Sequence, residues 1–271
     1  MKISNSAIQT FKQCRRMYEL KYIYDLVPVS TADALSRGLA YHEGVENLLK
    51  NDSQPIENPK IRAMVEAFRI YILPALEMQR DVRIQSVEEW FEYRVPNKRK
   101  KKAHVVMGRL DATTDRGLVV EHKTTSGLID GAYWQRLEFD EQIMSYMLAT
   151  KSTGVYYTVC ATPSIRQKQN ETDDEFYSRC LEWYAVDTEH KIDVQLITKT
   201  PEELQRFALE QDAIISEIEK CKNFYRNPGN CMKWGRMCEY APVCMNFDPT
   251  QEYVQFKERE RNYEKVGEAK D

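Results

Sequence analysis

The sequence lacks any apolar run that approaches the roughly 20 residues of a membrane-spanning helix. Its first residues, MKISNSAIQTFKQC, also lack the apolar core of a secretory signal, so we expect a cytoplasmic protein with no membrane segment. No internal repeat and no low-complexity segment is found. Charge of one sign does not dominate either, because 39 Lys and Arg stand against 42 Asp and Glu. The net charge of −3 neither indicates nor excludes binding to nucleic acid.

The seven cysteines are an odd number, and in a reducing compartment they do not predict a set of disulfides. Free thiols, a metal site or a metal cluster are the remaining interpretations. The length of 271 residues, with 42% hydrophobic and 30% charged residues, is typical of a soluble globular protein with a sizeable core.

The hydrophobic pattern changes along the chain from a helical to an alternating period. Helices are expected over residues 4–24, 32–50, 59–80, 134–150 and 200–225. Strands are expected over residues 87–96, 103–114, 117–124, 154–162 and 181–188. Pro74 should kink or end the third helix. Helices followed by a meander and a strand–helix–strand unit predict an α/β fold with a mixed sheet flanked by helices.

Two of these strands form a hairpin in GRLDATTDRGLVVEHKTTS, residues 108–126. If the hairpin turns about Arg116, Asp111 lies opposite Glu121, with β-carbons about 4.5–5.5 Å apart. Lys123 shares the face of Glu121, and His122 points to the other face.

Two carboxylates at that separation repel each other unless a cation compensates them. Mg²⁺ or Mn²⁺ suits such oxygen ligands, and a nearby lysine can contact a phosphate oxygen or a water molecule. The alternative is an exposed hairpin with cross-strand ion pairs. The apolar run GLVV before Glu121 argues against it, because charges that end a buried strand require partners.

Three further side chains extend this candidate site. His42 is expected on an apolar helical stripe with Leu35, Leu39, Val45 and Leu49, either as a core residue or as a metal ligand. Gly38, one turn earlier, would let that helix approach the sheet closely. Gln142 and Tyr146 are spaced i and i+4 and share a helix face, where packing is the alternative role.

Taken in order, the segments GLAYH (38–42), GRLD (108–111), EHK (121–123) and QIMSY (142–146) resemble the RecB-type nucleases of the PD-(D/E)XK superfamily. The N-terminal SNSAIQTFKQCRRMYELKY and a late cysteine cluster add to the resemblance, which covers about residues 4–248. In size and layout the chain is similar to single-domain members, the CRISPR-associated adaptation exonucleases and their phage relatives.

The resemblance implies a restriction-endonuclease-like mixed sheet, an N-terminal helical part and a C-terminal iron–sulfur segment. It implies one nuclease domain over residues 1–250, with a helical insertion at about 32–80, a core at about 87–190 and a cluster-bearing part at about 200–248. Residues 251–271 would form a charged tail.

The resemblance also implies roles for individual residues. His42, Asp111 and Glu121 would bind Mg²⁺ or Mn²⁺ together with the backbone carbonyl of His122. Lys123 would be the catalytic lysine. Gln142 and Tyr146 would match the Q-x3-Y motif, which helps organise the site and the DNA.

Cys231, Cys238 and Cys244, together with the distant Cys14, resemble the ligands of a 4Fe–4S cluster in iron–sulfur nucleases of this type. A four-cysteine Zn²⁺ site and plain buried thiols are the alternatives. Cys160, Cys180 and Cys221 are expected to be packing residues.

The run of basic residues after Asn97 is a candidate phosphate contact, or else a solvated loop. The expected DNA-binding residues are Lys98, Arg99, Lys100, Lys101, Lys102 and Arg109. Tyr133, Trp134 and Trp234 would either stack on unpaired bases or belong to the core.

Together these features predict a metal-dependent DNA exonuclease that acts at DNA ends or on single strands, with recombination or CRISPR adaptation proteins as possible partners. The alternatives are a non-catalytic DNA-end-binding or adaptor protein with the same fold, and a zinc-stabilised nucleic-acid binder.

Overall fold

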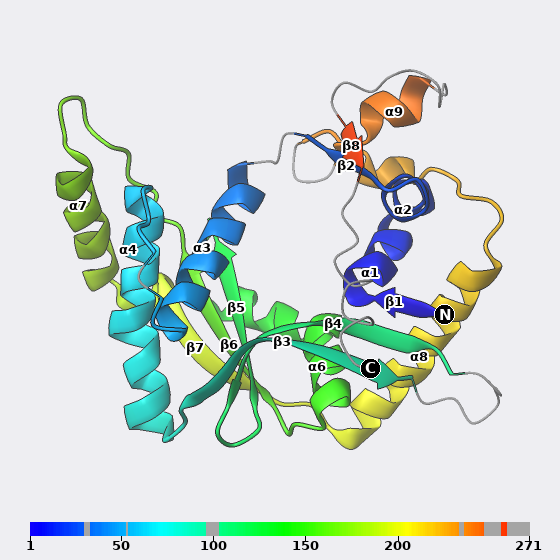
Figure 1. Cartoon of the computed structure of the whole chain (residues 1–271), viewed down its shortest axis with the longest axis horizontal. Helices are drawn as coiled ribbons and strands as arrows, with labels where there is room; N and C mark the ends of the chain where they lie inside the picture. Colours follow the sequence, from blue (N-terminus) through cyan, green and yellow to red (C-terminus); the bar gives the residue numbers. More distant parts are fainter. Residues whose placement is uncertain (30–32, 53, 96–102, 233–235, 247–255, 259–271) are drawn as a thin grey trace.

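The computed structural model describes residues 1–29, 33–52, 54–95, 103–232, 236–246 and 256–258 (Figure 1). A six-stranded mixed sheet lies at its centre, with the strand order β1-β4-β5-β6-β7 and with β3 paired to β4. The strands are β1 (Lys2–Ser4), β3 (Ile84–Arg94), β4 (Val105–Thr114), β5 (Val119–Thr125), β6 (Val155–Ala161) and β7 (Ile192–Ile197). The predicted α/β class with a mixed sheet flanked by helices is confirmed.

The sheet forks along β4. Strand β3 pairs antiparallel with nearly all of β4, from Val105 to Thr114, and occupies one of its edges. The other edge is shared: β5 pairs antiparallel at Ala112 and Thr113, and β1 pairs parallel at Val105–Met107. Residues 108–111 of β4 therefore lie at the fork, between one partner strand and the next.

Helices cover both faces of the sheet (Figure 1). Helices α1 (Asn5–Gln13), α6 (Glu141–Thr150) and α8 (Pro201–Lys220) pack on one face, where residues such as Ile8, Ile143 and Ile215 are fully buried. On the other face lie α3 (Asp33–Leu49) and α4 (Pro59–Ala67), which bury Tyr41 and Met64 against the strands. Helix α7 (Asp173–Ala185) packs on the outer side of α4.

The N-terminal segment is more broken than the single helix expected over residues 4–24. Its first residues form β1, and Ser4 then caps α1 by accepting a hydrogen bond from the nitrogen of Ala7. Extended backbone at Cys14 ends α1 before the short α2 (Arg15–Tyr18) and a π-helical turn (Glu19–Ile23). A three-residue strand carries no periodicity, so β1 could not be recognised from the pattern.

The third predicted helix, residues 59–80, continues past Pro74. Asn58 caps α4, which is followed by π-helical turns at Phe68–Ile72 and Ala75–Gln79. Pro74 has helical dihedral angles (φ −63°, ψ −34°) and falls between the two π turns. Such turns alter the backbone hydrogen-bond pattern locally, which is where a residue without an N–H can be accommodated.

The strand predicted at 181–188 is wrong, because α7 extends to Ala185. A capping box between Thr172 and Glu175 starts this helix, and the strand that pairs antiparallel with β6 is β7. The helix predicted at 134–150 is divided into α5 (Gly131–Gln135), a 3₁₀ turn (Arg136–Phe139) and α6, since Asp140 is extended and caps α6. Helix α8 ends at Lys220 rather than at residue 225.

The C-terminal part lies beside the N-terminal helices (Figure 1). It contains a 3₁₀ turn (Pro228–Asn230), α9 (Ala241–Asn246) and β8 (Phe256–Glu258), which pairs antiparallel with β2 (Leu26–Pro28). Within the expected charged tail 251–271, only 256–258 belong to the described residues. No helix among the described residues is long and apolar enough to span a membrane.

Candidate active site

The candidate acids lie at the fork between β4 and β5. The predicted register is correct, because Ala112 pairs with Val120 and Thr113 with Val119. The ladder stops there, one pair short of Asp111 and Glu121. In place of a continued ladder, the backbone nitrogen of His122 donates to Oδ2 of Asp111 at 2.7 Å. The two acids therefore flank the point where the strands part, instead of closing a regular pair.

Asp111 is held in its ionised form. Burial alone would raise the pKa of its carboxyl, but the contact with His42, the charges of His122 and His42, and the backbone N–H of His122 outweigh burial and lower the pKa to about 2. His42 reaches across from α3, with its Nδ1 3.5 Å from Oδ1 of Asp111. Burial opposes the charge of His42, but Asp111 and Glu121 together raise the pKa of its ring.

The pKa of Glu121 is shifted in the opposite direction. Its burial, reinforced by the charge of Asp111, raises the pKa of its carboxyl to about 7, although Lys123 opposes the shift. One oxygen, Oε1, pairs with the ammonium of Lys123. The other, Oε2, is buried without a hydrogen-bond partner in the described part of the chain. An unpartnered buried carboxylate oxygen is costly and marks a position that a cation would satisfy.

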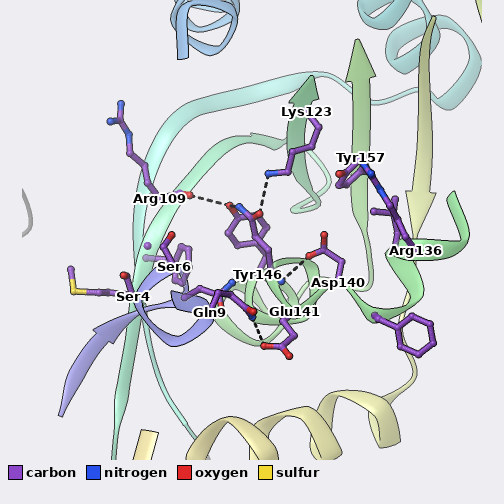
Figure 2. Close-up of a pocket in the computed structure, with 17 residues that line it drawn as sticks. Ser4, Ser6, Gln9, Arg109, Lys123, Arg136, Asp140, Glu141, Tyr146 and Tyr157 are labelled. Carbon is purple, nitrogen blue, oxygen red and sulfur yellow. Dashed lines mark hydrogen bonds between the residues drawn. The ribbon is translucent and has the colours of Figure 1, made fainter. Parts of the chain in front are cut away.

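Lys123, which pairs with Glu121, forms a connected chain with Gln142 and Tyr146; Figure 2 labels Lys123 and Tyr146. Nζ of Lys123 donates to Oε1 of Gln142 at 3.0 Å, and Nε2 of Gln142 donates to the hydroxyl of Tyr146 at 2.6 Å. That hydroxyl donates to the carbonyl of Arg109 at 3.3 Å, which connects α6 to β4. The i, i+4 spacing thus places both polar side chains on the face of α6 that meets the candidate site.

Helix α3, which supplies His42, does not bury all the residues that were predicted to face the core. Tyr41 and Val45 are fully buried in the core, whereas Leu35 and Leu39 are 56% and 61% exposed. The first half of the expected stripe, Leu35 and Leu39, therefore faces away from the core, whereas its second half, Val45 and Leu49, packs in the core. A Cβ on Gly38 would lie 3.5 Å from Oγ1 of Thr124, an ordinary contact, so the approach of α3 to β5 does not require glycine.

The side chain of His122 lies on the α3–α4 side of the sheet. Its Nδ1 is 2.8 Å from Oγ1 of Thr158, and its ring packs edge-on against Phe68. Burial lowers the pKa of this ring to about 4, so it stays neutral. The sequence pattern singled out only the carbonyl of this residue, whereas the buried ring also anchors β5 at the fork.

Two glutamates near the fork were not identified from the sequence. Arg109 pairs with Glu88, and its Nη2 lies 3.6 Å from Oε1 of Glu46. Burial raises the pKa of Glu88, and Asp111 adds to the shift while Arg109 opposes it. Glu88 has a positive φ of 60°, which is unusual in a strand. No sequence pattern around Glu88 predicts this backbone conformation. Figure 2 shows the side chain of Arg109 extending away from Tyr146. Arg109 was expected to contact DNA, but in this structure its guanidinium pairs with Glu88.

The four cysteines expected at the cluster line one cavity of about 240 Å³, although Cys14 is far from the others in sequence. No disulfide joins them. Burial raises the pKa of the Cys238 and Cys244 thiols, and Arg226 and Arg16 oppose this at Cys244. The cavity lies between the N-terminal helices and the segment around α9.

Some of the predicted nucleic-acid contacts lie outside the described residues, and others are packed in the core. The basic run Lys98–Lys102 and Trp234 lie outside the described residues. Tyr133 is 6% exposed, and Trp134 packs against Tyr157 with ring centroids 6.1 Å apart. Both rings therefore belong to the core and do not form a stacking surface.

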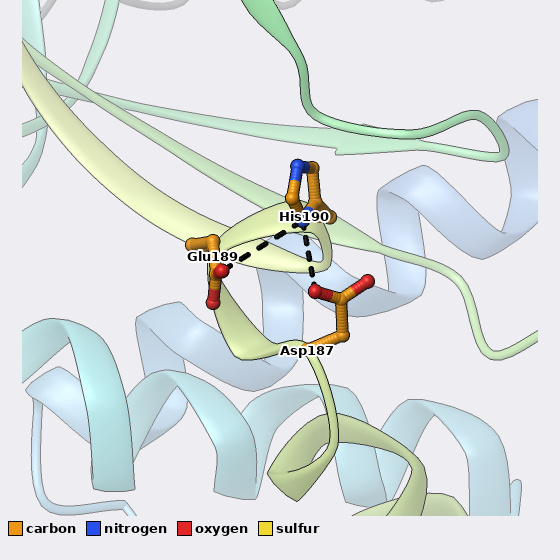
Figure 3. A group of neighbouring side chains, drawn as sticks. All are labelled: Asp187, Glu189 and His190. Carbon is orange, nitrogen blue, oxygen red and sulfur yellow. Dashed lines mark hydrogen bonds and ion pairs between the residues drawn. The ribbon is translucent and has the colours of Figure 1, made fainter.

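A separate group of possible ligands lies near the start of β7 (Figure 3). Among the described residues, Asp187, Glu189 and His190 are the one set of three whose ligand atoms all fall within 4.8 Å of one another. Nδ1 of His190 is 3.0 Å from Oδ1 of Asp187 and 3.9 Å from Oε1 of Glu189. These exposed side chains compensate one another at the surface. It also follows that His42, Asp111 and Glu121 do not converge as tightly as this set.

A family model described as the PD-(D/E)XK nuclease superfamily matches residues 2–245. The chain belongs to the PD-(D/E)XK nuclease superfamily. Members usually use divalent metals, and the buried, unpartnered Oε2 of Glu121 fits that chemistry.

Two solved structures show only low sequence identity to this chain. A structure of SSO0001 is 12% identical, with a TM-score of 0.41 and coverage of 83% of this chain and 79% of that chain. A phage related exonuclease from Haemophilus somnus 129PT is 13% identical, with a TM-score of 0.38 and coverage of 80% and 96%. No protein with a curated description matches the chain.

Proposed function

We propose that this protein is a divalent-metal-dependent deoxyribonuclease that hydrolyses phosphodiester bonds at DNA ends or in single strands. The observation that carries the proposal is the asymmetric acid pair at the fork. Asp111 is held ionised, while buried Glu121 keeps one oxygen without a partner next to the ammonium of Lys123. Acids with such different environments beside a lysine are typical of a reactive site.

His42, Asp111, Glu121 and the backbone carbonyl of His122 would hold the ion. Their donor set of carboxylate, carbonyl and imidazole atoms fits Mg²⁺ or Mn²⁺. A divalent ion bound there would lower the pKa of a water molecule and neutralise charge on the phosphate. In the present structure the ammonium of Lys123 pairs with Glu121, and the ring of His42 contacts Asp111.

Lys123 and the residues behind it would act directly on the phosphate. The ammonium of Lys123 would contact a phosphate oxygen that gains charge during hydrolysis. Gln142 holds that ammonium at 3.0 Å and is itself oriented by Tyr146. Gln142 and Tyr146 would therefore be positioning residues, and Arg109 contributes its backbone carbonyl to the same chain.

We also propose that Cys14, Cys231, Cys238 and Cys244 bind a 4Fe–4S cluster. A tetrahedral zinc site with Zn–S distances near 2.3 Å would place its sulfur atoms about 3.8 Å apart. Among the described residues, no three of these Sγ atoms lie within 4.8 Å of one another. The wider spacing around a cavity of about 240 Å³ favours a multi-iron cluster over zinc.

The decisive experiment measures cleavage of DNA labelled at either end, with Mg²⁺ or Mn²⁺ and with EDTA. We expect cleavage that requires metal and that disappears in Glu121→Gln and Lys123→Met. Binding of DNA ends without cleavage by any metal-loaded sample would instead identify a non-catalytic DNA-binding protein. Comparison of 5′-labelled and 3′-labelled single strands and duplexes then distinguishes exonuclease from endonuclease activity.

A further inference from the structure

A compartment of about 830 Å³ opens next to Lys123, and neither Asp111 nor Glu121 belongs to its lining (Figure 2). Its walls are the first turn of α1, the middle of β3 and β4, the 3₁₀ turn 136–139 and the start of α6. Pockets of roughly 300–1,000 Å³ accommodate ligands of drug size, a class that includes one or two nucleotides.

The rim of this compartment carries an aromatic side chain with no packing role. Phe139 lines the compartment and is nevertheless 85% exposed, whereas its neighbour Leu137 is 2% exposed. Because this exposed ring stands in the lining of the compartment, a ligand that enters can bury it and gain free energy. The face of an unpaired base is a suitable cover, and such stacking tolerates any base.

The backbone on both sides of Phe139 is anchored. Lys199, with a side chain only 1% exposed, donates to the carbonyl of Glu138 at 2.8 Å and to its Oε2 at 3.0 Å. On the other side, Oδ1 of Asp140 accepts from the nitrogens of Gln142 at 2.8 Å and Ile143 at 3.1 Å. The ring is therefore presented from a fixed backbone.

The charge available inside the compartment is positive. The guanidinium carbon of Arg136 lies 3.7 Å from the ring centroid of Tyr133, and no acid pairs with Arg136 in the part of the chain that the structure describes. Of the two acids in the lining, Asp140 caps α6 and Glu141 pairs with Lys12. The N-terminus of α1, with Ser4, Asn5 and Ser6 in the lining, adds the positive end of a helix dipole.

We propose that this compartment receives one or two unpaired nucleotides of the strand being cut, with a base stacked on Phe139 and a phosphate beside Arg136. The inference rests on the proposed nuclease function and names its substrate as a DNA strand that is single at the cleavage point. A duplex end would have to separate locally before its strand could enter.

The test uses tryptophan as a reporter in metal-free buffer, where DNA is not cleaved. Phe139→Trp is compared with Met78→Trp, an 84% exposed position outside the compartment, and with the unsubstituted chain and its four tryptophans. We expect a short oligothymidylate to quench the fluorescence that Phe139→Trp adds and to leave that of Met78→Trp unchanged. A blunt duplex should quench neither.

Affinity gives a second reading. Phe139→Ala should weaken binding of the oligothymidylate roughly tenfold without changing the Tm, and Phe139→Tyr should retain binding. Equal quenching of Phe139→Trp and Met78→Trp, or unchanged affinity in Phe139→Ala, would overturn the proposal that this compartment binds the strand.

Parallel cleavage assays with Mn²⁺ keep the two proposals apart. If the unsubstituted protein cleaves DNA but the Phe139 variants behave like the control, only the compartment is wrong. If Phe139→Trp is quenched but no sample cleaves, the compartment stands as a DNA-binding site and the nuclease proposal fails.

Discussion

The backbone nitrogen of His122 lies 2.7 Å from Oδ2 of Asp111 and joins β5 to β4 directly beyond the last pair of their ladder. This bond keeps the aspartate at the fork and helps to lower its pKa to about 2, while Glu121 on the neighbouring strand has a pKa of about 7. Two carboxyl groups with such different pKa values can adopt different protonation states near neutral pH.

Glu121→Gln and Lys123→Met should each reduce DNA cleavage by at least about a hundredfold, because each removes a charge that acts on the ion or on the phosphate. Lys2→Met is the matched control, since Lys2 is also a strand lysine paired with a glutamate, Glu92, but lies at the surface. Initial rates on end-labelled DNA with Mn²⁺ provide the measurement. Full activity in either active-site variant would show that the site is elsewhere.

The stability gained from Mg²⁺ or Mn²⁺ should grow as pH rises from 6 to 8. The pKa of Glu121 is raised to about 7 from an unfolded value near 4.5, so its contribution to stability is present below pH 4.5 and is lost as pH rises through 7. A bound cation requires the ionised carboxylate and offsets this loss.

The pKa of Asp111 is lowered, so its contribution to stability is present above its unfolded value near 3.8 and is lost only as pH falls toward 2, outside this range. Thermal denaturation with and without Mn²⁺ at each pH tests the prediction. The metal-induced rise in Tm should be smaller and less dependent on pH in Glu121→Gln, where His42 is the remaining ligand that has to lose a proton in this range. A rise in Tm that is equal at pH 6 and pH 8 in the unsubstituted protein would contradict it.

Protein purified without oxygen should be brown and should contain iron and acid-labile sulfide. Cys238→Ser should remove the visible absorbance and lower the Tm, because Cys14 and the C-terminal segment would lose their link. Cys221→Ser is the control, since Cys221 lies outside the cavity and donates to the carbonyl of Asn223. A colourless protein with one equivalent of zinc would instead establish the zinc alternative.

Gly44→Ala should destabilise the fold by about 1–2 kcal/mol, although alanine favours a helix. A Cβ at this position would lie 2.6 Å from Cγ2 of Val65 and 3.1 Å from Cδ1 of Ile56, so the contact between α3 and α4 would have to open. Chemical denaturation measures the effect. Val65→Ala makes room, and the double variant should be more stable than the sum of the two single effects predicts. Strict additivity would mean that the two positions do not clash.

The sequence by itself determined the features that depend on near neighbours. The register about Arg116 followed from a short turn between two alternating runs, and the spacing of Gln142 and Tyr146 placed them on one helix face. The strand prediction for residues 181–188 failed because their alternating pattern is also compatible with an amphipathic helix. The capping box that Thr172 forms with Glu175 marks the start of that helix. Local patterns set the element type only where no second period fits equally well.

Only the tertiary structure decided what separate elements do together. The forking of β4 depends on β1 entering where β5 departs, and the contact of His42 with Asp111 joins α3 to the sheet. The unpartnered oxygen of Glu121 and the exposed ring of Phe139 are consequences of packing between segments far apart in the chain. Burial and electrostatic environment arise from such long-range contacts, which no spacing of residues along the sequence specifies.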